Sequence, residues 1–123
     1  MITYILAALA LYFIQSMLPT ALRYGGSMPT LISAMGPRDQ KPAETPLVGR
    51  AERALANIGE ALFYFIPLAI LTKDIPEALL GAQIFVTARL VYLPVYLVGI
   101  PYLRTLVWTA SLVGLAIMIA ALL

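Results

Sequence analysis

Four long apolar segments make up most of the chain: residues 2–22, 50–71, 75–98 and 102–123. Each is close to the roughly 20 residues that a helix needs to cross a bilayer. In lipid only helices and closed barrels satisfy all backbone hydrogen bonds, and apolar runs of this length indicate helices. The pattern therefore predicts an all-α integral membrane four-helix bundle, with residues 1–123 forming a single transmembrane domain.

The connections between these segments differ in length. A Gly- and Pro-containing loop, residues 23–49, joins the first two segments, and its composition permits either an ordered or a flexible structure. The other two connections are short, so we expect the last three helices to be antiparallel neighbours. Asp74 and Glu77 are typical of a capping box at the start of the third helix. Pro67 and Pro94 fall inside helices and are expected to kink them.

Composition agrees with a membrane protein and narrows the chemistry. Hydrophobic residues make up 62% of the chain, whereas soluble domains contain roughly 45–50%. The chain has no Cys and no His, so it lacks the commonest general base and the commonest metal ligand, and we expect no metal site. The net charge is +2, with basic residues clustered in connections, which suits a topology signal better than nucleic-acid binding.

Charge in the connections predicts the orientation. Arg23, Arg38, Lys41 and Arg50 flank or lie in the first connection, and Arg104 follows the third. The middle connection carries a single lysine beside two acidic residues. The positive-inside rule therefore places the first and third connections in the cytoplasm and both termini on the opposite side.

A polar stripe runs along the second predicted helix. At 100° per residue, Arg50, Arg53, Asn57, Glu60 and Tyr64 fall within about 80° of one another. A charged side chain near the middle of a membrane costs roughly 2.5–3.5 kcal/mol, so such a stripe should face the bundle, a neighbouring subunit or a water-filled cavity. We therefore expect function to reside here.

The third helix carries a matching polar face. Arg89, Tyr92 and Tyr96 share one side of it. Glu60 lies about 15 Å and Arg89 about 13–14 Å from the cytoplasmic end of their helices, so the two are expected to meet. Two interpretations of this pair remain open, a ligand site and a purely structural buried ion pair. Arg50 is equally open, either as part of the stripe or as an anchor that extends to the membrane surface, and the same alternative holds less strongly for Arg53.

At these residues the sequence resembles the MAPEG family, the membrane-associated proteins in eicosanoid and glutathione metabolism. Residues 53–60, RALANIGE, fit the family pattern R-A-x-x-N-x-x-E on the second helix. Residues 88–92, ARLVY, followed by Tyr96, give a second match, and residues 103–105, LRT, open the fourth helix as in the family. The resemblance covers essentially the whole chain, including the long first loop.

The resemblance implies a homotrimer that binds glutathione as co-substrate between adjacent subunits. The glutathione-contacting positions of the family are matched by Arg53, Asn57, Glu60, Arg89, Tyr96 and, more loosely, Arg23. It further implies that Arg104 stabilises the glutathione thiolate, and that Thr105 stands where some members place a serine hydroxyl. The chemistry is consistent, because arginines bind carboxylates in pairs of hydrogen bonds and raise the thiolate fraction of a nearby thiol.

These matches predict a glutathione-dependent transferase or peroxidase that acts on a lipophilic electrophile, with a role in detoxification. The compact loops resemble bacterial-type members, which implies a bacterial inner membrane with both termini periplasmic and membrane lipids as partners. Leu55 and Ala56 stand where some enzymatic members have a basic pair, and Trp108 where some have a tyrosine. These departures favour an alternative, a non-catalytic member that binds a lipid or another small ligand at the subunit interface.

A third class, the small multidrug exporters, also has four spans with a buried carboxylate. Those proteins use a carboxylate that usually lies in the first span, and residues 2–22 contain none. The sequence therefore favours an exporter far less than a glutathione-dependent enzyme or a non-catalytic family member.

Overall fold

The computed structural model describes residues 1–123 and is entirely helical. Its five helices are α1 (Ile2–Tyr24), α2 (Met28–Ser33), α3 (Pro46–Leu71), α4 (Ala78–Val98) and α5 (Pro101–Leu122). All but α2 are long and apolar enough to cross a membrane. The predicted all-α membrane protein with four spans is confirmed.

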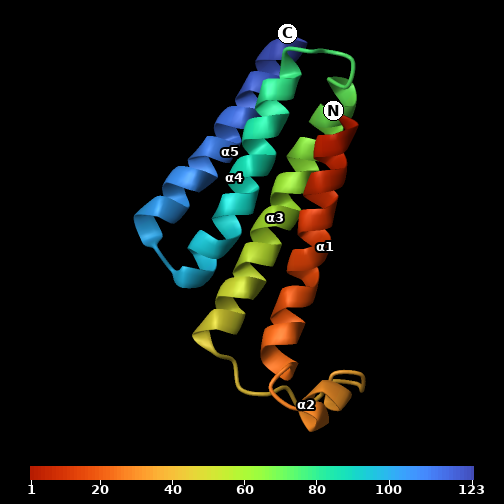
Figure 1. Ribbon diagram of the computed structural model, residues 1–123, viewed down its shortest axis with the longest axis vertical. Helices are drawn as coiled ribbons and strands as arrows, with labels where there is room; N and C mark the ends of the chain where they lie inside the picture. Colours follow the sequence, from red (N-terminus) through yellow and green to blue (C-terminus); the bar gives the residue numbers. More distant parts are fainter.

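The four long helices run antiparallel in chain order, so both termini lie at the same end and α2 at the opposite end (Figure 1). The closest packing is between α4 and α5 and then between α1 and α3, and both pairs also contact each other. The last three helices are thus antiparallel neighbours as expected, although the closest partner of α3 is α1. Pro19, Pro67 and Pro94 lie in the interior of α1, α3 and α4, and each helix continues past its proline.

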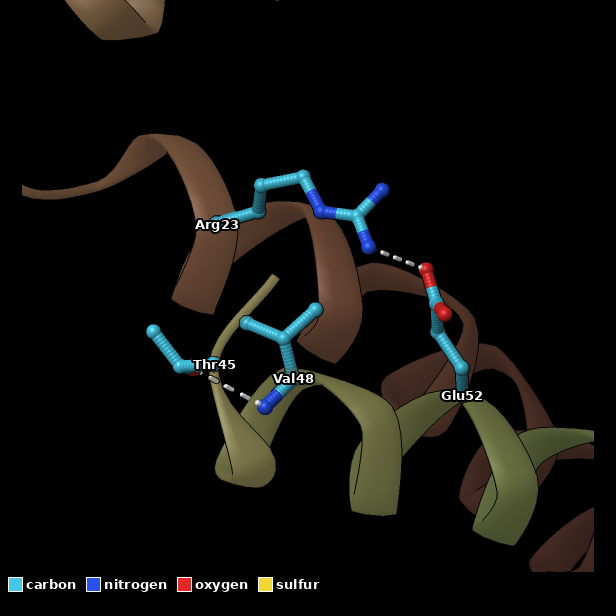
Figure 2. A network of polar contacts seen from close by, with 4 residues as sticks. All are labelled: Arg23, Thr45, Val48 and Glu52. Carbon is cyan, nitrogen blue, oxygen red and sulfur yellow. Dashed lines mark hydrogen bonds and ion pairs between the residues drawn. The ribbon is translucent and has the colours of Figure 1, made fainter. Parts of the chain in front are cut away.

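The start of α3 is set by a local cap. The Thr45 hydroxyl oxygen accepts a hydrogen bond from the backbone N–H of Val48 at 3.3 Å (Figure 2), and Pro46 occupies the first turn. Both features favour helix initiation. As a result α3 begins at Pro46, four residues before the expected start at Arg50.

The start of α4 contradicts the sequence-based expectation. The predicted capping box of Asp74 and Glu77 is wrong, because α4 begins at Ala78 with Glu77 as its N-cap residue, which leaves Asp74 three residues before the cap, and the Glu77 side chain makes no capping hydrogen bond. The backbone N–H of Ala78 instead donates to the carbonyl of Ile75 at 3.2 Å. A tight backbone turn therefore satisfies the first donor of α4, and no side-chain cap is needed.

The first connection is partly ordered by α2. Here a capping box does form, with the Ser27 hydroxyl accepting from the Thr30 N–H and the Thr30 hydroxyl accepting from the Ser27 N–H. The Thr30 hydroxyl is also within hydrogen-bond distance of the Tyr24 carbonyl, at 2.8 Å. These bonds hold α2 against the end of α1 and leave its apolar side chains exposed.

The core depends on aromatic stacking and on very close helix contact. Phe65 of α3 and Phe85 of α4 are fully buried and stacked, with ring centroids 4.2 Å apart. Between α4 and α5 the backbones meet at Gly81 and Gly114, where a Cβ on Gly81 would lie 2.5 Å from the Gly114 carbonyl oxygen. Only glycine fits that crossing, because a Cβ there collides with backbone and not with a movable side chain.

Arg50 joins the end of α4 to α3. Its Nη1 donates to the carbonyls of Leu97 at 3.0 Å and Val98 at 3.3 Å. Those carbonyls have no partner within the helix, and a cation is favourable at a helix C-terminus. The stripe residue Arg50 therefore has a structural role within the subunit.

We expect Arg50→Met to lower the free energy of unfolding by about 1 kcal/mol, because it removes a charge-assisted cap while keeping the apolar stem. Thermal melting in detergent measures this against the parent. Lys73→Met is the matched control, since Lys73 is exposed and makes only a 3.8 Å ion pair with Asp74. Equal melting of parent and Arg50→Met would contradict the assigned role.

Candidate functional site

Two adjacent polar cavities lie between α3, α4 and α5. One, of about 260 Å³, is lined by Asn57, Tyr92, Tyr96, Arg104, Thr105 and Trp108. The other, of about 210 Å³, is lined by Asn57, Glu60, Ala61, Tyr64, Arg89, Trp108, Leu112 and Leu115. They share Asn57 and Trp108, and we call the two together the polar cavities. A polar lining of this kind is costly inside membrane helices, which marks it as a candidate site.

Arg89 is the buried centre of this region, with 3% of its surface exposed. Its Nη1 donates to Asn57 Oδ1 at 2.5 Å. The guanidinium carbon lies 5.4 Å from the Phe85 ring centroid and 5.5 Å from that of Tyr92. The buried Nε has no hydrogen-bond partner. One amide and two aromatic faces therefore hold this cation, and it forms no ion pair within the subunit.

The expected ion pair between Glu60 and Arg89 is wrong for the subunit, although both line the same cavity. Asn57, nearly one turn earlier on α3, takes the hydrogen bond from Arg89. Glu60 is exposed on the surface of the subunit and makes no hydrogen bond or ion pair there. Its carboxylate is therefore free to bind a group from outside the subunit.

Arg104 stands at the first turns of α5 and is half-buried. Its guanidinium carbon lies 5.1 Å from the Tyr96 ring centroid, and the Tyr96 ring lies 5.4 Å from that of Tyr92. Arg104 forms no ion pair within the subunit. The nearby Thr105 hydroxyl donates to the carbonyl of Pro101 at 3.3 Å. This cavity thus presents a cation positioned by aromatic rings and without a counter-ion, a suitable place for an anion.

Two candidate residues lie outside the polar cavities. Arg53 is exposed on α3 and has no ion-pair partner. Arg23, at the end of α1, pairs with Glu52 of α3, with Nη2 and Oε1 2.7 Å apart (Figure 2). The remaining six candidates all line the polar cavities: Asn57, Glu60, Arg89, Tyr96, Arg104 and Thr105.

The structure adds Trp108 to the candidate residues as a wall common to both cavities. The sequence contained a usable signal for it, because Trp108 follows Arg104 by four residues and such residues share a helix face. No comparable signal pointed to Glu52, whose importance depends on where the end of α1 lies against α3.

The polar cavities are open toward the outside of the subunit. Glu60 lies about 21 Å along α3, a helix about 39 Å long, so its exposed carboxylate is near mid-span. Arg53 is exposed two turns earlier on the same helix. A carboxylate near mid-span cannot face lipid cheaply, whereas Arg53 lies closer to the end of the helix.

Among known protein families, the MAPEG family matches the chain over residues 1–123, its whole length. No curated protein and no solved structure matches it.

Proposed function

Because the chain belongs to the MAPEG family, we propose that it is a membrane-embedded glutathione-dependent transferase or peroxidase that acts on a lipophilic electrophile. One observation carries this proposal. Asn57, Arg89, Tyr96 and Arg104, from three different helices, converge on polar cavities inside an otherwise apolar bundle. Ionisable and amide side chains inside membrane helices are rare and typically mark a ligand or substrate site.

The charges left unpaired by the subunit fit glutathione, which has two carboxylates, an ammonium group and a thiol. Arg53 and Arg104 have no ion-pair partner and suit a carboxylate and a thiolate, respectively. The free carboxylate of Glu60 suits the ammonium group. Each cavity alone is smaller than the roughly 300–1,000 Å³ of most small-molecule sites. Because Asn57 and Trp108 line both cavities, the two are adjacent, and we propose that the ligand occupies both.

Arg104 is the residue that we propose for activation. Bound glutathione would supply a thiol that gives its proton to water. The sulfur would then form a bond to the electrophilic carbon. The bond from that carbon to the leaving atom would break at the same time, and the leaving atom would keep the electron pair. Arg104, held over the Tyr96 ring, stabilises the negative sulfur. Thr105 contributes a hydroxyl at the same cavity, and this hydroxyl must leave the Pro101 carbonyl in order to donate to a ligand.

We further propose that the working form is a homotrimer. A neighbouring subunit would cover Arg53 and Glu60, avoiding for the mid-span Glu60 a cost of roughly 2.5–3.5 kcal/mol for a charge left facing lipid. Arg23 lies away from the polar cavities of its own subunit, so any contact with glutathione would be made across that interface. We place the protein in a bacterial inner membrane, with the α2 end in the cytoplasm and both termini in the periplasm.

Thermal melting of the detergent-purified protein with millimolar glutathione tests ligand binding. Since glutathione would bind only the folded state, we expect it to raise the melting temperature of the parent by several degrees. Arg89→Met should fold, because Met fills the space of an unpaired buried cation, but should lose the shift. Thr87→Val, on the same helix and outside the polar cavities, should keep it.

An equal shift in the parent and in Arg89→Met would place glutathione elsewhere. No shift in the parent at saturating glutathione would favour the non-catalytic alternative, in which this interface binds a lipid or another small ligand.

A further inference from the structure

A third polar cavity, of about 200 Å³, lies where the end of α1, the segment after α2 and the start of α3 meet. We call it the basic cavity, because three of its lining side chains are cations: Arg23, Arg38 and Lys41. Glu52 is its single carboxylate. It shares no lining residue with the polar cavities. An excess of two positive charges around one cavity favours an anionic ligand.

Arg23 is held in place and still has donors to offer. Its side chain is only 12% exposed, and Nη2 binds Glu52 at 2.7 Å (Figure 2). Its buried Nε has no hydrogen-bond partner. Leaving a buried donor unpaired costs about 1–3 kcal/mol, so a ligand acceptor at this point would recover that cost.

Arg38 lines the same cavity from the segment after α2. It has φ +59°, a left-handed conformation that non-glycine residues adopt rarely. Its Nε donates to the Ala34 carbonyl at 2.6 Å, and its guanidinium carbon lies 5.9 Å from the Tyr24 ring centroid. The terminal nitrogens make no hydrogen bond or ion pair and remain available.

The surroundings of the basic cavity indicate which anion it meets. Next to it, α2 exposes the apolar side chains of Leu31 (47%) and Ile32 (62%), and Met35, just after the helix, is 87% exposed. Thr30 ties this helix to Tyr24, which lines the cavity. Apolar side chains beside a cluster of cations, at the end of a membrane span, are typical of a segment lying at the level of lipid headgroups.

We propose that the basic cavity binds a phosphate group at the membrane surface, held by Arg23, Arg38 and Lys41. The location favours the headgroup of an anionic phospholipid as its source, and free phosphate offers the same chemistry. Glu52 orients Arg23 and opposes the anion, so it tunes the affinity. The basic cavity shares Arg23 with the proposed glutathione contacts but no residue with the polar cavities, so the test varies Arg38, Lys41 and Glu52 and leaves Arg23 in place.

The test is thermal melting in detergent titrated with short-chain phosphatidylglycerol, with inorganic phosphate, and with short-chain phosphatidylcholine. We expect phosphatidylglycerol to raise the melting temperature, with little effect of phosphatidylcholine. The double variant Arg38→Gln, Lys41→Gln should bind at least tenfold more weakly. Lys73→Gln, an exposed lysine in the α3–α4 connection, should bind like the parent.

The titrations with inorganic phosphate and with phosphatidylcholine decide between a lipid headgroup and free phosphate as the ligand, and they exclude a general lipid effect. A shift with phosphate as large as with phosphatidylglycerol, lost in the double variant, supports the site and assigns it to free phosphate. Equal shifts with both lipids, or a full shift in the double variant, would overturn the proposal.

Glu52→Gln provides a second test of the proposal if the double variant does not fold. Removing the only carboxylate should tighten binding of phosphatidylglycerol severalfold, whereas a purely structural role of Glu52 predicts no tightening. Weaker or unchanged binding in this variant would also count against the proposal. The glutathione-induced shift should be the same in the double variant and the parent, which keeps this test separate from that of the proposed function.

Discussion

We expect Arg104→Gln to lower kcat of the glutathione-dependent reaction by roughly 100-fold. The glutathione-induced rise in melting temperature should stay largely intact. The reason is that Arg104 meets the charge that develops on sulfur, and removing one such preorganised donor typically costs a factor of 10²–10³ in rate. Within the subunit it has no counter-ion and is positioned only by the Tyr96 ring. Steady-state turnover of a lipophilic aryl halide measures the loss.

The pH dependence of turnover separates this role from simple binding. A free thiol has a pKa of about 8.5, so at neutral pH the thiolate fraction depends on the nearby cation, whereas at high pH the thiolate forms without it. The deficit of Arg104→Gln should therefore shrink as the pH rises toward 9, and Arg104→Lys should recover part of the activity. Thr109→Val, on an exposed face of α5, is the control. If the loss of turnover in Arg104→Gln stayed constant with pH, Arg104 would have no role in activating the thiol.

A second large effect is expected on stability, at the crossing of α4 and α5. Gly81→Ala should lower the free energy of unfolding by about 1–3 kcal/mol, the usual cost of overpacking. The added Cβ would lie 2.5 Å from the Gly114 carbonyl oxygen and 3.0 Å from the backbone nitrogen of Met118. Backbone atoms cannot rotate out of the way, so the two helices must separate.

Gly59→Ala is the matched control for this effect. Its Cβ would meet only the Tyr12 ring, at 3.6 Å, which is ordinary contact. Replacing Gly by Ala inside a helix otherwise stabilises by roughly 0.5–1 kcal/mol. Melting in detergent should therefore order the proteins as Gly59→Ala, parent, Gly81→Ala, from most to least stable. A Gly81→Ala protein as stable as the parent would show that α4 and α5 are farther apart than described.

Sequence periodicity predicted correctly which polar residues share a face of each helix. Asn57 and Glu60 are three residues apart on α3, and a rigid helical repeat puts them on one face whatever surrounds it. The same argument placed Tyr92 and Tyr96 together on α4, and the structure confirms that all four line the polar cavities. The sequence also predicted the four membrane-spanning helices, because an apolar run of about 20 residues in lipid satisfies its backbone hydrogen bonds as a helix.

Periodicity did not predict which side chains from different helices meet. Matching depths suggested Glu60 for Arg89, but the amide of Asn57 takes that hydrogen bond. Depth along a helix fixes one coordinate only. The rotation and axial offset of neighbouring helices fix the others, and they come from packing. The same holds for Arg50, whose binding to the end of α4 depends on where α4 stops beside α3.

The sequence by itself thus determined the helices, their membrane character and the polar face of α3, since these follow from local pattern and from the solvent properties of the bilayer. Only the tertiary structure decided that Arg89 binds Asn57, that Trp108 joins two cavities, and that Arg23 belongs with Glu52. The physical reason is that such contacts depend on how closely helix backbones approach one another. Between α4 and α5, for example, that distance is set jointly by Gly81 and Gly114, which lie far apart in the chain.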